Sequence, residues 1–291
     1  MINCQRLLTL FVLFFIFSGM AHADAASSAQ KAIDNYDRGE YHVAWPGLFK
    51  AAQAGHAEAQ YRLGACYEGG MCGKSDYTQA AYWYEKAARQ GHAGAQFGIG
   101  NLYYRGFGVA ASSEKAVYWI RLSAMQGNPV AAHYLAWFYE KGLAPLEKNH
   151  AEAAKWYMQD AQAGGHWSQH ALGRYYEAGC GVEKNPVLAA HWYRKAARQQ
   201  DIPAMFRLGL LYLGEAGHVP DLPQALFWIN RAAAHGYAPA QFRLGMMFEH
   251  GTGVLQNPGK AFAWYQRAKA NPDQEGLNQA NGSILEMGSC P

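Results

Sequence analysis

The chain is 291 residues long, half of its residues are hydrophobic and 14% are aromatic, a composition that excludes an intrinsically disordered protein. Its 25 basic and 22 acidic residues leave a net charge of +3 at pH 7. The near balance, without a basic stripe or a block of like charge, argues against a nucleic-acid-binding protein.

Residues 1–23 have the pattern of a signal peptide. Arg6 precedes an apolar run over residues 7–17, and the sequence Ala-His-Ala that ends at Ala23 is a small-x-small cleavage site. The run is shorter than the roughly 18 residues that a membrane-spanning helix needs, and no later stretch reaches that length. We therefore expect cleavage near Ala23, delivery to the periplasm or secretion, and no stable membrane insertion.

Residues 24–56 are predicted to form an irregular first unit of a repeat array. They end in KAAQAGH, which recurs almost unchanged as KAARQGH at residues 86–92, although this alignment sets Gly47, not Trp45, opposite Trp83. The terminal unit of such an array is usually atypical, because one of its faces meets water instead of another repeat. We interpret this segment as the N-terminal cap.

Residues 57–270 contain six tandem copies of one unit. Each copy carries a segment like AAYWYEKAARQG at residues 80–91, and its tryptophan recurs every 36 or 37 residues, as Trp83, Trp119, Trp156, Trp192, Trp228 and Trp264. A fixed period of this length indicates a solenoid, in which each unit buries its apolar face only by stacking on its neighbours.

Each unit has the pattern of a helical hairpin. In the first full unit Ala59, Leu63 and Tyr67 lie on one face of a helix, a glycine pair follows, and a second helix is predicted over residues 77–90. The glycine of a Leu-Gly pair recurs in mid-helix, where it costs up to about 1 kcal/mol relative to alanine. We therefore expect two backbones to approach closely there.

Four cysteines follow the signal peptide, and export permits disulfides. Cys66 and Cys180 lie three repeats apart, too far for a direct bond. Cys66 could instead pair with Cys72 across a tight loop, or the two could be a small apolar residue and a free thiol. Cys290 could pair with Cys180 only if residues 271–291, which we interpret as a C-terminal cap or tail, fold back.

The unit resembles the Sel-one-like repeat, a relative of the tetratricopeptide repeat. Its pattern is A-x-x-x-L-G-x-x-Y-x-x-G-x-G-V followed by A-x-x-W-Y-x-x-A-A-x-x-G, and residues 168–200 depart from it only at Ser168 and Gln200. The resemblance implies an all-α fold, a right-handed α-solenoid of antiparallel helix pairs with about 36 residues per repeat. It also implies that the first helix of each pair lines a concave surface.

The same resemblance predicts which side chains face that concave surface. Positions two residues before the leucine of each Leu-Gly pair hold a ring or an imidazole in every unit, and Trp137 and Trp167 fall on concave positions that the repeat pattern does not require. Rigid aromatic anchors beside polar groups are typical of a peptide-binding groove, although the rings could also fill their own hollow. The predicted partner-binding residues are Phe97, Asn101, Tyr104, Arg105, His133, Trp137, Glu140, Trp167, His170, Arg174, Glu177 and Phe206.

The sequence contains no recognisable catalytic motif, and we predict neither a cofactor nor a metal. His56, His92 and His166 are assigned to the same inter-repeat turn, so repeat duplication explains them better than metal binding does. A helix junction is expected between His166 and His170. The GxGV loops follow a helix and lack the rest of a phosphate-binding motif, so they are interpreted as turns.

These patterns together predict a function. Because members of the resembled family commonly act as adaptors in bacterial envelopes or in host interaction, we expect a non-catalytic scaffold that binds a protein or peptide in its concave groove. The alternative is an envelope protein that binds or hydrolyses a β-lactam or peptidoglycan, as some cysteine-rich relatives suggest. Their cysteine pair in every repeat is absent here. Recognition of cell-wall glycan by the aromatic lining is a third possibility.

Overall fold

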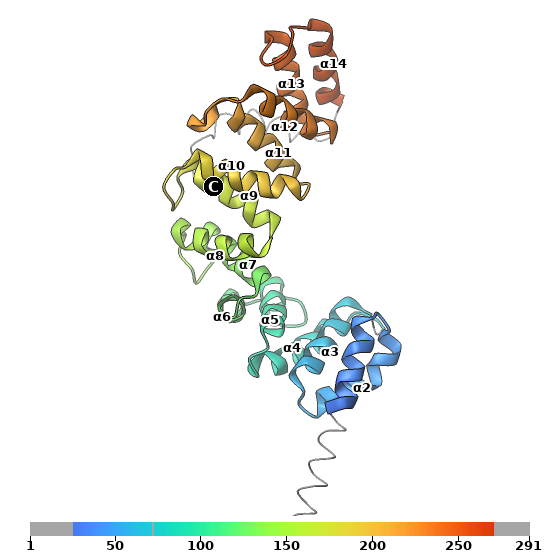
Figure 1. Cartoon of the computed structure of the whole chain (residues 1–291). Coiled ribbons are helices and arrows are strands. Elements are labelled where there is room, and N and C mark those ends of the chain that lie inside the picture. Colours follow the sequence, from blue (N-terminus) through green and yellow to red (C-terminus); the bar gives the residue numbers. More distant parts are fainter. Residues whose placement is uncertain (1–25, 72, 271–291) are drawn as a thin grey trace, which may run out of the picture. The chain divides into compact units, whose positions relative to one another are not determined.

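The structure is a computed structural model that describes residues 26–71 and 73–270. The predicted signal peptide and the C-terminal cap or tail lie outside the described residues. Within them every regular element is a helix, and the helices follow one another in pairs (Figure 1). The chain forms two compact units, which divide between Asn128 and Pro129 at a repeat boundary. The predicted all-α solenoid of helix pairs is confirmed.

Unit 1 comprises the cap and the first two repeats. The cap consists of a helix over residues 26–37 and the helix that follows it, α2. Two further helical hairpins come after the cap. The helices of the cap and the two repeats are α2 (Tyr41–Gln53), α3 (Ala57–Gly69), α4 (Tyr77–Arg89), α5 (Ala93–Arg105) and α6 (Ser113–Met125).

Unit 2 comprises repeats three to six. Its helices are α7 (Pro129–Lys141), α8 (His150–Ala163), α9 (His166–Ala178), α10 (Pro186–Arg198), α11 (Ile202–Tyr212), the short 3₁₀ helix η1 (Glu215–Gly217), α12 (Leu222–Ala234), α13 (Ala238–His250) and α14 (Pro258–Ala270). None of the helices described in either unit is long and apolar enough to span a membrane.

Short polar residues begin the second helices. The side chain of Asp76 accepts a hydrogen bond from the backbone N–H of Gln79, and Asn149 caps α8 in the same way. These bonds satisfy N–H groups that have no partner inside the helix. The first helix of each of these repeats ends at a glycine, so the polar loops between helices are turns, as the sequence predicts.

The recurring mid-helix glycine makes room for an aromatic ring. A Cβ placed on Gly64 would lie 2.6 Å from Cδ1 of Tyr84, and one on Gly173 would lie 2.4 Å from Cδ1 of Tyr193. At these two positions a tyrosine side chain of the facing helix occupies the space. At Gly209 the expected close approach of two backbones is confirmed, because a Cβ there would lie 3.2 Å from the backbone nitrogen of Ile229 and 3.3 Å from the carbonyl oxygen of Ala225. Packing of this density leaves no space for even one added methyl group.

Buried glutamines connect the first, second, fourth and sixth repeats to the unit that precedes each of them. Gln60 donates to the carbonyl oxygen of Ala52 at 3.0 Å, and Gln90, 30 residues further on, donates to Oε1 of Gln60 at 2.7 Å. The same arrangement recurs with Gln96 and Gln126. These side chains satisfy carbonyl groups near helix ends that would otherwise be buried without a partner.

The repeat tryptophans differ in burial, and two cysteines form disulfides. Three of the repeat tryptophans, Trp83, Trp192 and Trp228, are buried in the core, and the other three are half-buried. Cys66 and Cys180 each take part in a disulfide. Cys72 and Cys290 lie outside the described residues, so the pairing of Cys66 with Cys72 stays a prediction.

Candidate functional site

Four of the predicted binding residues lie along one face of α9. Trp167, His170, Arg174 and Glu177 are spaced by three, four and three residues, so they follow the same stripe of the helix. The Trp167 side chain is 63% exposed, whereas the other three are half-buried. We call this stripe the α9 face.

Further predicted residues lie on α7, and one of them contacts the first turn of α9. His133 and Trp137 are half-buried, and Nδ1 of His133 lies 2.8 Å from the Ser168 hydroxyl oxygen in the first turn of α9. The same nitrogen lies 3.7 Å from Oδ2 of Asp160. Burial lowers the pKa of His133, so its imidazole is held in the neutral form more strongly than a free histidine.

Glu140 does not belong to an exposed groove, and its assignment as a binding residue is corrected. It is buried, its Oε2 accepts hydrogen bonds from the hydroxyls of Tyr157 at 3.0 Å and Tyr175 at 3.3 Å, and Lys141 lies 2.9 Å from Oε1. Burial raises the pKa of Glu140, but the bonds from Lys141 and Tyr157 outweigh it and leave the pKa below its usual value. This carboxylate joins helices within the core.

Glu177 has a similar inner role but keeps one unused oxygen. Its Oε2 accepts a hydrogen bond from the Tyr193 hydroxyl at 2.6 Å. Its Oε1 is buried, lies 3.8 Å from Nη1 of Arg207 and has no hydrogen-bond partner among the described residues. Oδ2 of Asp201 and Oε2 of Glu215 are also buried acceptors without a partner there. Acceptors of this kind are stabilised by water or by an incoming donor.

The assignment of Phe206 as a binding residue is also corrected, because its ring is buried. Only 4% of the residue is exposed, and the ring packs edge-on against Tyr237 at 5.6 Å between centroids. The neighbouring Arg207 takes the half-buried position beside Glu177. Arg207 is not among the residues predicted from the sequence. Arginine also precedes the Leu-Gly pair as Arg62 and Arg243, and this recurrence is the signal that could have revealed it.

The remaining predicted residues belong to unit 1. Phe97, Asn101 and Tyr104 are half-buried on α5, and Arg105 is exposed at its end. The guanidinium of Arg105 lies 4.1 Å from the centroid of the Phe107 ring, a distance at which a cation is attracted by the ring face. Within their unit these four residues occupy one helix.

The histidines are placed differently from the sequence prediction. His56 and His92 cap helices by accepting a hydrogen bond through Nδ1, but His166 is the first residue of α9 and Gly165 is the cap. His166 and His170 therefore lie on the same helix, and the helix junction expected between them is wrong. The described part of the chain contains no group of three or more His, Cys, Asp or Glu residues that could hold a metal ion.

Comparison with known proteins identifies the repeat. The family model for the Sel1 repeat matches six segments, residues 57–92, 93–128, 129–159, 168–201, 202–237 and 238–273. None of the curated proteins matches the chain.

Solved structures show the same fold. A Sel1 repeat protein from Oxalobacter formigenes is 30% identical, with a TM-score of 0.69 over 85% of this chain and 98% of that one. A protective antigen of uropathogenic Escherichia coli with an SLR fold is also 30% identical, with a TM-score of 0.78 over 95% of this chain. The chain spans only 60% of the length of that antigen. With six matching repeats and this fold, the chain belongs to the Sel1 repeat family.

Proposed function

We propose that the chain is a non-catalytic scaffold of the bacterial envelope, and that it holds a segment of a partner protein against the α9 face. Sel1 repeat proteins are generally protein-interaction scaffolds, which supports the general class of function. The envelope assignment is supported by the signal-peptide pattern of residues 1–23 and by the bacterial origin of both similar structures.

The observation that carries the proposal is the exposed indole of Trp167. The side chain is 63% exposed in the first turn of α9, although a tryptophan in a stacked array gains most by being buried. Large rigid rings of this kind are the usual anchors of protein interfaces. The partner segment would place an apolar side chain on this ring.

The chemistry of the partner segment follows from the unused acceptors. One buried oxygen each of Glu177 and Asp201 has no hydrogen-bond donor among the residues that the structure describes. Arg174 adds a positive charge to the same stripe. Both oxygens are enclosed in the free chain, so the proposal includes an outward turn of the half-buried Glu177 and His170 side chains on binding. A lysine, an arginine or a free backbone N–H group in the partner would then donate to them. We therefore expect a segment that combines an apolar residue with a basic one.

A photocrosslinking amino acid in place of Trp167 tests this function in the exported full-length chain. The matched control carries the same amino acid in place of Phe227, which is 52% exposed on the second helix α12. We expect a discrete protein adduct from position 167, absent from position 227, and weakened by salt because charges contribute. Equal adducts from both positions, or none from position 167, would overturn the proposal.

A double substitution gives an independent check on the same face. Changing Trp167 and Arg174 together to alanine should abolish formation of the adduct from a crosslinker placed at Trp137. The melting temperature should change little, because Trp167 is mostly exposed. A large fall in melting temperature would show that the two side chains serve the core instead.

A further inference from the structure

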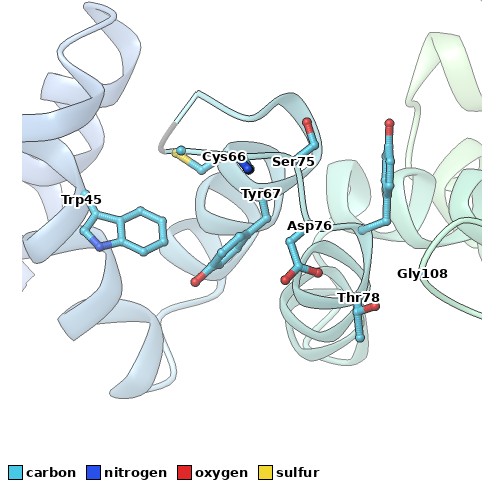
Figure 2. A pocket seen from close by; sticks show the side chains of 10 residues that line it. Trp45, Cys66, Tyr67, Ser75, Asp76, Thr78 and Gly108 are labelled. Carbon is cyan, nitrogen blue, oxygen red and sulfur yellow. The ribbon is translucent and has the colours of Figure 1, made fainter.

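Unit 1 contains a cavity of about 560 Å³ at the loop between α3 and α4. The indole of Trp45 and the ring of Tyr67 form one side of it, and Lys74, Ser75 and Asp76 line the loop side. Figure 2 shows Trp45 from α2 and Tyr67 from α3 pointing toward each other, with Ser75 and Asp76 beyond Tyr67. A cavity of this volume is in the range of small-molecule sites.

A single loop position helps to leave this space open. The loops of the second, fourth and sixth repeats contain a valine, Val109, Val182 or Val254, which packs against the core of its own repeat. The first repeat has Gly73 at the same place in its loop, and a Cβ built there would meet nothing within 4 Å. The apolar side chain that lines this position in those three repeats is therefore missing here.

Two aromatic residues border the opened space. The rings of Trp45 and Tyr67 lie 5.2 Å apart between centroids at an angle of 78°, so together they form a corner. The cavity of about 440 Å³ in the sixth repeat has Leu226 and Phe248 at the equivalent positions. The first repeat thus replaces apolar lining with rings that carry an N–H and an O–H group.

The polar groups around the corner are unused. The indole N–H of Trp45, the hydroxyls of Tyr67, Ser75 and Thr78, and the ammonium of Lys74 have no hydrogen-bond or ion-pair partner among the described residues. Burial, with the nearby Asp76 carboxylate as a second cause, raises the pKa of Tyr67, so its hydroxyl remains a donor at neutral pH. One oxygen of Asp76 caps α4 through Gln79, and the other is free to accept.

We propose that this cavity is a saccharide-binding site that takes one or two pyranose rings of an oligosaccharide. The C–H face of a pyranose carries partial positive charge and packs on the negative face of an aromatic ring, while its hydroxyls need donors and acceptors around the rim. The corner of Trp45 and Tyr67 offers the aromatic faces. Lys74, Ser75 and Asp76 offer the donors and acceptors. The site lies in unit 1 and does not rest on the α9 face.

Titration calorimetry of the full mature chain with triacetylchitotriose and with cellotriose tests the proposal. We expect one of the two trisaccharides to bind with a dissociation constant of about 1 mM or lower. Saturation-transfer NMR should show the ring protons of the sugar receiving magnetisation from aromatic protons of the protein. No binding of either sugar at 10 times that concentration would overturn the inference.

Variants locate the binding. Trp45→Ala should weaken it by about tenfold or more, and Tyr67→Phe and Lys74→Ala, which keep the packing, by about two- to fivefold. Asp76→Asn retains a capping side chain and should also weaken binding. Phe227→Ala in unit 2, at a residue that is 52% exposed, is the control and should leave the affinity unchanged. If Tyr67→Phe, Lys74→Ala and Asp76→Asn all bind as the natural chain does, the sugar binds elsewhere and the assignment fails.

Discussion

The fourth and fifth repeats fold alike but fill two equivalent positions with opposite chemistry. In the fourth repeat Glu177 on α9 accepts from Tyr193 on α10, and in the fifth the same positions hold Leu213 and Ile229. A glycine lies against the second-helix residue in both repeats: a Cβ on Gly209 would lie 2.5 Å from Cγ1 of Ile229. The packing is thus preserved while a hydrogen-bonded pair is exchanged for an apolar one.

The rest of the chain obeys the same rule. Tyr84 pairs with Glu68, Tyr157 with Glu140 and Tyr265 with Glu249, whereas the second repeat, which lacks the glutamate, has Ile120 in place of the tyrosine. A buried carboxylate without its donor would cost about 1–3 kcal/mol or more, so neither member is changed alone. The comparison teaches that the repeat is conserved as contacts rather than as residues.

The largest effect is expected from adding a side chain at the glycine that lies against the second helix in both repeats. Gly173→Val should lower stability by about 3 kcal/mol, because the Tyr193 ring is buried and cannot move away from the added side chain. Thermal unfolding followed by circular dichroism measures the change. Val187→Ala, at a side chain that is 68% exposed, is the control and should unfold like the natural chain.

The next prediction converts the fourth repeat into the fifth. Tyr193→Ile alone should cost about 3 kcal/mol, since it removes the donor to Glu177 and part of the core. Adding Glu177→Leu should recover about 2 kcal/mol of this loss, because no carboxylate is then left without its donor. Denaturant unfolding of the natural chain, the two single variants and the double variant measures the coupling. Strictly additive losses would refute the pairing.

A smaller effect is expected at the glutamines that connect repeats. Gln169 donates to the carbonyl of Ala161 at 3.1 Å and accepts from Gln199 at 2.9 Å, while the fifth repeat has Met205 and His235 at these positions. Gln169→Met should cost about 1 kcal/mol, because a buried carbonyl loses its donor. Adding Gln199→His should not increase the loss. A double variant that is much less stable than Gln169→Met would contradict this.

The smallest effect is a pH-dependent change in stability at Glu58 of the first repeat. The equivalent position of the fourth repeat is Trp167. Oε2 of Glu58 lies 2.7 Å from Nε2 of His92, and this hydrogen bond holds the pKa of Glu58 below its usual value. The stabilisation is therefore present above the unfolded pKa near 4.3 and is lost as the pH falls through the lower folded value.

Comparing Glu58→Gln with the natural chain tests this sign. At pH 7 the substitution should cost about 1 kcal/mol or less, because the pair is partly exposed. At pH 3 the difference in melting temperature should shrink toward zero. A difference that grows on acidification would show that the carboxylate is stabilised in its protonated form.

The sequence by itself determined the helix pairs, their period and most of their ends. Periodicity, capping residues and glycines are local signals, and they recur in each repeat. Where the signal is weak in one repeat, the other repeats therefore indicate where the helices begin and end. It also singled out Trp167, because an aromatic residue that the repeat pattern does not require needs another explanation. The turn interpretation of the loops followed from the same local evidence.

Only the tertiary structure decided which of the predicted binding residues are buried. Glu140 and Phe206 occupy register positions that the resemblance assigned to a binding surface, yet both are buried, because Tyr157 on α8 faces Glu140 and Tyr237, the residue before α13, faces Phe206. Likewise, the cavity beside Trp45 forms only where α2, α3 and the loop after α3 come together. The burial of a residue depends on which side chain a neighbouring element places opposite it. The spacing of residues along one helix does not predict that side chain.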